Sequence, residues 1–346
     1  MSPPSPIRFY RRERRTRPAA LLRGFVAVAA AASLAGCGAS AGPSTDENGT
    51  TTIKVGVLPS AMVAPLYLGI AKGVFEKAGL KIEPQQAEGG AALLPALLNN
   101  QTQVAYSNVV SLMLAQQQGL PVQVVANGAL QVAPGSGPQT GRTGEAVVVA
   151  PGSSIKSAKD LKGKTVAVNT LKNVEEVLTK YSIDQAGGDS SAVRLIEMPT
   201  SQMLPALEQG RIDAANVIEP YTTAAIDAGA KTLLRPFTDM PDPAANIPVY
   251  FASARFMKQN PELMQRFTTA MNEALEYAQA HPEEARAVVR TYTKIEPDLV
   301  ERMVLPHWTP KLNVTSIKMM GDLSVRYGLL TGPPDLDRLL GKTPRL

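Results

Sequence analysis

Short apolar runs alternate along the chain with segments whose apolar residues recur every three or four positions. Short runs rich in Val and Ile predict buried strands, and the longer spacing predicts amphipathic helices. Leu66, Ile70 and Val74, for example, repeat at i+4 along a helix that we expect to begin at Pro65. Gly79 should end that helix, because glycine readily adopts the left-handed cap conformation.

The predicted strands and helices alternate through most of the chain. We predict strands at residues 53–58, 80–83, 104–106, 122–125, 145–150, 165–169, 193–198, 214–218, 232–234 and 247–253. We predict helices at residues 65–79, 91–98, 109–118, 174–185, 203–209, 221–228 and from 261 onward. Strands that alternate with helices indicate parallel βαβ units.

Two parts of the chain repeat each other. Residues 94–97 (Leu-Pro-Ala-Leu) recur as residues 204–207, and Val55 recurs as Val166 at nearly the same offset. Repetition of motif and element order predicts two similar lobes. Residues 128–143, rich in Gly, Pro, Gln and Ser, should form an exposed loop between them.

The expected fold class is therefore α/β with two lobes, each a mostly parallel sheet flanked by helices, and a ligand cleft between the lobes. We expect residues 53–143 to begin lobe 1, residues 144–250 to form lobe 2, and residues 251–346 to return as helices to lobe 1. The chain then crosses between lobes near residues 144–151 and 246–253. Two crossings make a natural hinge.

Residues 1–36 have the pattern of a secretory signal peptide. Seven arginines precede an apolar run at residues 25–35. That run of 11 residues is too short for a membrane span, which takes roughly 20 residues. A basic leader, a short apolar core and small residues before a cleavage site are typical of a signal that is removed.

Cys37 is the single cysteine of the chain, so no intrachain disulfide can form. It ends the phrase Leu34-Ala35-Gly36-Cys37, which resembles a bacterial lipobox. There the thiol receives diacylglycerol, and several acyl chains hold a protein stably on a membrane. We therefore predict a lipoprotein anchored to the outer face of the cytoplasmic membrane, with residues 37–52 as a flexible tether.

The charge balance depends on the leader. The whole chain has 35 basic and 30 acidic residues, whereas the chain from Cys37 onward has 28 and 29. A nearly neutral mature protein does not predict a nucleic-acid surface. The sequence also has no metal-ligand spacing, glycine-rich phosphate loop or nucleophile elbow, so we expect no metal and no cofactor.

Polar and aromatic side chains follow several predicted strands. Ligands of open α/β sheets bind at the carboxyl ends of strands. We therefore expect ligand contacts from Ser60, Met62, Tyr106, Ser107, Asn108, Asn169, Thr170, Lys172, Glu219 and Tyr221.

Each candidate also fits a structural role. Ser107 and Asn108 can cap a helix, and Asn173 with Glu176 fits a capping pair. Glu219 either contacts ligand or bridges the hinge. Ser60 can instead cap a turn, and Tyr106 and Tyr221 can instead pack at the rim of the cleft.

Several phrases resemble the type-II periplasmic binding proteins of the sulfonate, nitrate and taurine group, which also includes binders of a thiamine pyrimidine precursor. The resemblance covers most of residues 53–330. It is carried by residues 53–59 (Ile-Lys-Val-Gly-Val-Leu-Pro), 64–71, 72–80, 160–168, 208–215 and 218–221. The first lobe departs from the pattern at residues 100–103, where Asn-Gln-Thr-Gln replaces the family's Gly-x-x-Asp.

The resemblance implies a monomeric solute-binding protein that hands a small molecule to the membrane permease of an ABC importer. A catalytic relative of the same fold and a ligand-presenting sensory module are the alternatives. The ligand class stays open between a nitrogen heterocycle and a sulfonate, taurine or nitrate. Glu175, Glu176 and Glu219 outnumber Lys172 near the expected cleft, which favours a neutral or cationic ligand.

We predict that Cys37→Ala removes the protein from the membrane fraction or leaves it uncleaved, because only the acylated thiol buries enough hydrocarbon for stable attachment. Labelling cells with a radioactive fatty acid measures the modification, with Ser40→Ala as a neighbouring control. Equal label in the wild-type protein and in Cys37→Ala would contradict the lipobox.

Overall fold

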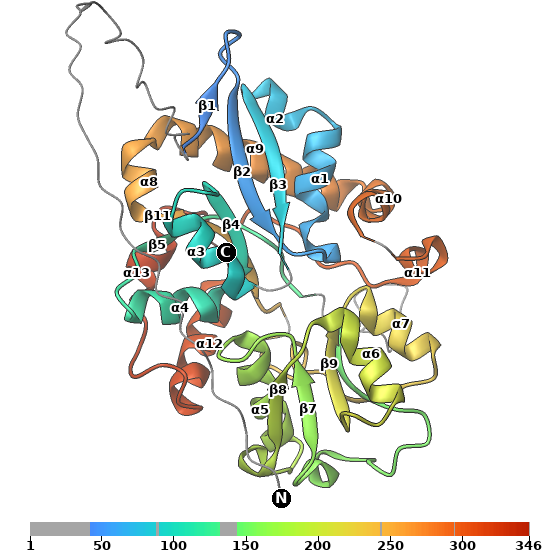
Figure 1. The fold of residues 1–346 in the computed structure, drawn as a ribbon. Helices are drawn as coiled ribbons and strands as arrows, with labels where there is room; N and C mark the ends of the chain where they lie inside the picture. Colours follow the sequence, from blue (N-terminus) through green and yellow to red (C-terminus); the bar gives the residue numbers. More distant parts are fainter. Residues whose placement is uncertain (1–41, 88–89, 132–143, 243, 294, 346) are drawn as a thin grey trace, which may run out of the picture. The chain divides into compact units, whose positions relative to one another are not determined.

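Two β-sheets organise the computed structural model, which describes residues 42–87, 90–131, 144–242, 244–293 and 295–345 (Figure 1). The predicted signal peptide (residues 1–36) and Cys37 lie outside these residues. In the described part of the chain, no helix is both long and apolar enough to cross a membrane.

The first sheet has six strands among the described residues: β1 (Ser44–Thr45), β2 (Thr51–Val57), β3 (Leu80–Gln86), β4 (Val104–Asn108), β5 (Val122–Asn127) and β11 (Pro248–Ser253). The strand order is β3-β2-β4-β11-β5, and β1 pairs with the beginning of β2. β2 runs parallel to β3 and β4, whereas β11 runs antiparallel to β4 and β5. This sheet and the helices packed on it form lobe 1.

The second sheet, again within the described residues, has five strands: β6 (Glu145–Val149), β7 (Thr165–Val168), β8 (Arg194–Glu197), β9 (Ala214–Ile218) and β10 (Lys231–Leu234). Its order, β8-β7-β9-β6-β10, repeats that of the first sheet. β7 is parallel to β8 and β9, and β6 is antiparallel to β9 and β10. Residues 145–234 form lobe 2.

The strand registers confirm the internal repeat seen in the sequence. Gly56 lies opposite Ala105 in lobe 1, and Ala167 lies opposite Ala215 in lobe 2. Each pair joins the first parallel strand of its lobe to the third. The same positions therefore meet in both sheets.

The expectation of mostly parallel sheets is wrong for the strands that follow the crossings. The chain changes lobe between β5 and β6 and again between β10 and β11. Glu145 begins β6 opposite Ile218, the last residue of β9, and Pro248 begins β11 opposite Asn108, the last residue of β4. A strand that enters where the parallel strands end must run against them, so each sheet is mixed.

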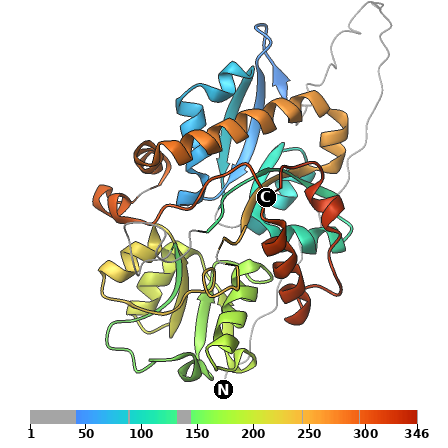
Figure 2. The same cartoon turned by 180° about the vertical axis from the view of Figure 1, so that it is seen from behind.

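Helices cover both sheets. Lobe 1 carries α1 (Ala64–Ala71), α2 (Val74–Lys77), α3 (Gly90–Leu98), α4 (Val109–Gln117), α8 (Ala254–Gln259), α9 (Pro261–Ala280) and α10 (Pro282–Tyr292). Lobe 2 carries α5 (Val174–Gln185), α6 (Thr200–Glu208) and α7 (Tyr221–Asp227). The long α9 crosses one face of the first sheet and packs on α1, as Figure 2 shows from behind. Short 3₁₀ helices lie at Ala61–Val63, Ala158–Leu161 and Ser190–Ala192.

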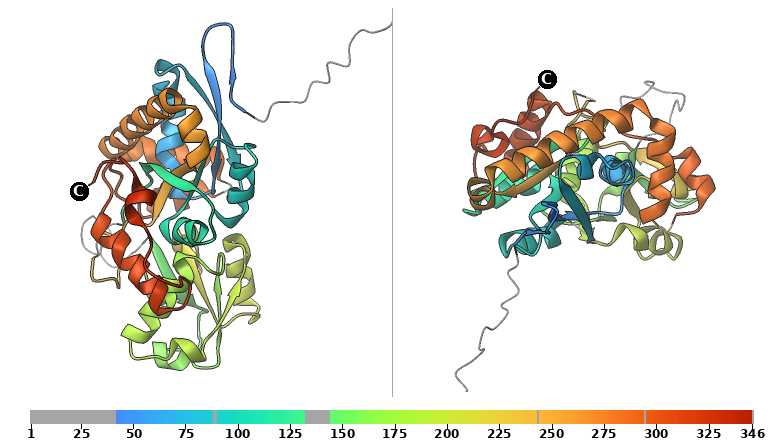
Figure 3. Two further views of the ribbon diagram at one scale, coloured as in Figure 1. Left: turned by 90° about the vertical axis from the view of Figure 1, so that its left-hand side faces the viewer. Right: turned by 90° about the horizontal axis from the view of Figure 1, so that it is seen from above.

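The last three helices are α11 (Pro297–Arg302), α12 (Val314–Arg326) and α13 (Leu336–Leu340), and the first two of them connect the lobes. α11 packs on α7, α12 packs on both α4 and α5, and α13 packs on β5 (Figure 3). Tyr327, at the end of α12, donates a hydrogen bond of 2.8 Å to Oδ2 of Asp184 in α5. Lobe 2 is therefore held from two sides by the carboxyl-terminal segment.

Three local expectations differ from the structure. Gly73, with φ of +70°, breaks the predicted helix of residues 65–79 into α1 and α2, although Gly79 ends α2 with φ of +67° as expected. β3 continues through Pro84, which an edge strand tolerates. Residues 44–52 form a hairpin, so the flexible tether predicted for residues 37–52 does not extend through them.

Candidate functional site

A cavity of about 50 Å³ lies between the lobes, at the carboxyl ends of the parallel strands. We call it the central cavity. Lobe 1 lines it with Leu58, Ser60, Met62, Tyr106, Ser107 and Asn108, and lobe 2 lines it with Asn169, Asn173, Val174, Glu175 and Ile218. The connection that returns to lobe 1 adds Phe237, Ile247 and Pro248. Both sheets and one of the two crossings therefore contribute to one site.

The structure brings most of the predicted contact residues together here. Six of them line the central cavity: Ser60, Met62, Tyr106, Ser107, Asn108 and Asn169. Tyr221 lines a neighbouring cavity that shares Ser60 and Asn169 with the central one. Thr170 and Lys172 line a larger cavity beside α4, and Glu219 lies in a separate hollow near the hinge. Contact of all ten side chains with a ligand stays a prediction.

Two hydroxyl groups in the central cavity are buried without a hydrogen-bond partner in the described structure. They belong to Tyr106 and Ser107, whose side chains are about 3% exposed. Burial raises the pKa of Tyr106 well above its ordinary value, so this phenol keeps its proton. Buried polar groups are normally paired, and an unpaired one costs roughly 1–3 kcal/mol. Both hydroxyls are therefore suited to hydrogen-bonding a ligand.

Two asparagines of the cavity wall begin helices. Asn108 Oδ1 accepts a hydrogen bond of 2.9 Å from the amide of Ser111, in α4. Asn173 Oδ1 accepts one of 3.2 Å from the amide of Glu176, in α5, and its Nδ2 donates to Asn169 Oδ1 at 2.8 Å. The capping role predicted for both residues is present. It also fixes these side chains in the wall of the cavity.

Glu175 is the functional candidate that the strand-end argument missed. It lies in the first turn of α5, is 3% exposed, and accepts a hydrogen bond of 2.9 Å from the amide of Asn169. Burial raises the pKa of Glu175 to about 8, against that hydrogen bond. The sequence signal was an acidic residue two positions after a capping asparagine. At neutral pH most of the molecules hold a proton on this carboxyl group.

A second carboxyl group, that of Glu145, is also buried and also has a raised pKa. Burial raises the pKa of Glu145 well above its ordinary value, and the nearby charge of Glu175 acts in the same direction. Glu145 Oε2 accepts a hydrogen bond of 3.1 Å from the amide of Phe237, which lines the cavity. No lysine or arginine lines the central cavity among the described residues. The described lining of the central cavity therefore offers the carboxyl group of Glu175, hydroxyls and amides, but no cationic side chain.

Hydrogen bonds connect Glu219 of lobe 2 to the segment that follows α11, while its predicted roles in ligand contact and in a hinge stay predictions. Its carboxylate accepts hydrogen bonds from the amide and hydroxyl of Thr223, at 3.1 and 2.8 Å, within lobe 2. Oε1 also accepts a bond of 2.9 Å from the amide of Val304, in the segment after α11. With a side chain only 4% exposed, Glu219 is a buried link between the lobes.

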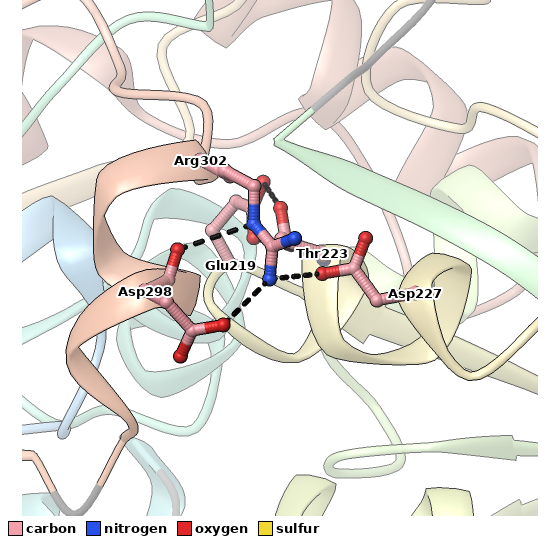
Figure 4. Close-up of polar contacts among 5 residues, drawn as sticks. All are labelled: Glu219, Thr223, Asp227, Asp298 and Arg302. Atoms are coloured by element: carbon pink, nitrogen blue, oxygen red, sulfur yellow. Dashed lines mark hydrogen bonds and ion pairs between the residues drawn. The ribbon is translucent and has the colours of Figure 1, made fainter.

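An ion-pair group extends this link toward solvent (Figure 4). The guanidinium of Arg302 in α11 pairs with Asp227 of α7 at 2.9 Å and with Asp298 of its own helix at 3.0 Å. We call Glu219, Thr223, Asp227, Arg302 and Val304 the clasp. Its inner end is buried and hydrogen-bonded, so we expect that end to contribute most of its stability.

Comparison with known proteins extends these observations. Residues 60–285 match a protein-family model described as NMT1/THI5 like. A "Putative aliphatic sulfonates-binding protein" of Bacillus subtilis (strain 168) is 26% identical over 280 residues, which is 78% of each chain. The 4-amino-5-hydroxymethyl-2-methylpyrimidine phosphate synthase of Aspergillus parasiticus is 25% identical over 248 residues, or 68% of this chain and 67% of that one.

The fold also matches a solved structure. The ligand binding component of an ABC-type import system from Staphylococcus aureus, solved with zinc bound, aligns with a TM-score of 0.72 and 17% identity. The alignment covers 85% of this chain and 99% of that chain, which confirms the predicted two-lobed fold. In the described part of this chain, no group of three or more His, Cys, Asp or Glu side chains is placed to hold a metal ion.

We predict that Glu219→Gln destabilises the unliganded protein by roughly 2–3 kcal/mol, because an amide nitrogen would face hydrogen-bond donors in a buried site. For a chain of about 300 residues the melting temperature should fall by about 3–5 °C. Small-angle scattering should show a larger radius of gyration. Asp298→Asn, at the exposed end of the same group, is the control and should change stability by at most ~1 kcal/mol. Equal effects of the two substitutions would contradict a buried clasp.

We predict that Glu175 makes stability fall as pH rises from about 4.5 to about 8. The unfolded chain loses this proton near pH 4.5, whereas the folded chain keeps it to about pH 8, so the folded state binds more protons between these values. Glu175→Gln should flatten the decline and stabilise the protein at pH 8 by a few kcal/mol. Denaturant titrations at several pH values test this, with the exposed Glu208→Gln as the control. A decline that is unchanged in Glu175→Gln would contradict the assignment.

Proposed function

Because the chain belongs to the NMT1/THI5-like family, we propose that it is the extracytoplasmic solute-binding component of an ABC importer. The central cavity is the observation that carries this proposal. It lies between two lobes, and each lobe turns the carboxyl ends of its parallel strands toward it. The chain crosses between the lobes twice, which suits opening and closing around a solute.

The size of the cavity supports a cycle of opening and closure. A volume of about 50 Å³ has room for about three to five water molecules at roughly 10–15 Å³ each. A heterocycle or an alkanesulfonate needs more space, so it enters when the lobes separate. The clasp, through Glu219 and Val304, then sets part of the free-energy difference between the open and closed arrangements.

A neutral or cationic solute, such as a nitrogen heterocycle of the pyrimidine-precursor type, is the ligand class that the lining favours. Tyr106 and Ser107 offer hydroxyl donors, and protonated Glu175 can donate to a ring nitrogen. A cationic ligand would instead favour ionised Glu175, whose proton is released to solvent, and would pair with its carboxylate. The absence of lysine and arginine from the described lining gives an anion no charged partner.

An aliphatic sulfonate is the second candidate, because two helices begin at the cavity. Asn108 and Asn173 place the amino-terminal ends of α4 and α5 in its wall. Helix amino termini attract anions through their free amide groups and the helix dipole. One relative is named a putative aliphatic sulfonates-binding protein, so sulfonates must be tested beside nitrogen heterocycles.

Binding without catalysis is the activity that we propose, despite the synthase among the relatives. Both histidines, His281 and His307, are exposed and lie outside the central cavity. Cys37 serves in the proposal as the lipid anchor. The anchor would hold the protein on the outer face of the cytoplasmic membrane, next to the permease. We propose that the protein is a monomer there.

We expect an aminopyrimidine to bind more tightly than a short alkanesulfonate in calorimetric titrations of the full chain. Glu175→Gln should weaken the aminopyrimidine about 30-fold if the bound ring is protonated, and should leave or improve sulfonate affinity. Glu208→Gln is the control. Titration in two buffers of different ionisation enthalpy counts the protons exchanged with Glu175. Preferred binding of the sulfonate, further improved by Glu175→Gln, would overturn the neutral or cationic class.

A further inference from the structure

A second cavity, larger than the central one, lies beside it. Its volume is about 240 Å³, and we call it the side pocket. Its wall is mostly apolar, formed by Leu94 of α3, Ser111 and Ala115 of α4, Phe251 of β11 and Leu171 of lobe 2. An apolar protein cavity of about 150 Å³ already binds benzene. The side pocket can therefore hold a ring or a short alkyl chain.

Ser107 connects the two cavities. This residue lines both of them, and its hydroxyl is buried without a hydrogen-bond partner in the described structure. A solute that reaches from one cavity into the other passes this hydroxyl. The unpaired group thus lies where the polar and apolar parts of such a solute would meet.

The loop from lobe 2 that closes the side pocket has unusual features. Leu171 is 37% exposed, which is high for a large apolar side chain. Lys172 has φ of +56°, a left-handed conformation that non-glycine residues rarely adopt. The amide of Lys172 donates a bond of 2.7 Å to Glu176, which holds the loop in place. Strained backbone of this kind is concentrated at ligand sites.

We infer that the side pocket receives an apolar arm of the same solute whose polar part occupies the central cavity. The inference rests on the proposed solute-binding function and narrows the substrate class to amphiphilic molecules with a ring or a chain of several carbons. Lobe 1 supplies most of the pocket, and closure brings Leu171 over the arm.

Toluene tests the pocket independently of any polar group. At about five times its Kd, toluene should raise the melting temperature of the full chain by about 1–2 °C. Ser111→Leu fills the pocket and should abolish the rise, and Ala115→Leu is a second filling variant in case the first folds poorly. Ala280→Leu, at an exposed position of α9, is the matched control and should keep the rise.

Two homologous series, n-alkylamines and n-alkanesulfonates, test whether one solute spans both cavities. In one series, affinity should increase up to about fourfold per methylene in the wild type and level off early in Ser111→Leu. A toluene effect that survives filling, or no gain with chain length, overturns the inference. If the proposed solute-binding function is wrong, the result is different: toluene binds, but no alkylamine and no alkanesulfonate binds. That outcome also overturns a shared solute.

Discussion

The insertion of lobe 2 between β5 and β11, two neighbouring strands of the first sheet, is the constraint on which the rest of the structure depends. β11 completes the first sheet only after the chain has built lobe 2, and β6 enters the second sheet as soon as the chain leaves lobe 1. Both strands begin where the neighbouring parallel strands end. The two crossings, the central cavity and the clasp therefore lie where the two lobes meet.

The buried polar groups between the lobes are of two kinds. Glu219 is buried with hydrogen bonds from Thr223 and Val304, so its charge is compensated and the lobes are joined. Tyr106, Ser107 and Glu175 are equally buried but are left with unpaired hydroxyls or a raised carboxyl pKa. That arrangement lowers the stability of the empty protein, and a suitable ligand would recover the loss. The central cavity and the clasp therefore differ in how fully hydrogen bonds compensate the burial of their polar groups.

The sequence predicted the fold better than the roles of individual side chains. Hydrophobic periodicity located α5 and β9 at their observed bounds, and the repeat of residues 94–97 at 204–207 corresponds to two sheets with the same strand order. Strand direction was not predictable, since an apolar run is alike in parallel and antiparallel pairing. Glu219 directly follows β9, whereas Glu175 lies in the first turn of α5, and the sequence does not show which of the two lines the cavity. The hydrogen bond between Glu219 and Val304 joins residues 85 positions apart, so the sequence pattern could not predict it.

The insertion of lobe 2 between β5 and β11 also has a consequence for assembly. Lobe 2 is one uninterrupted stretch of chain, residues 145–234, and has every strand of its sheet once β10 has emerged. Lobe 1 is interrupted: β4 and β5 have no shared neighbour until β11 arrives, although Tyr106 and Tyr250 must end opposite each other. Unpaired strand edges invite association with other chains. A chain that emerges from its amino end thus leaves the edges of β4 and β5 that face each other unpaired until β11 has emerged.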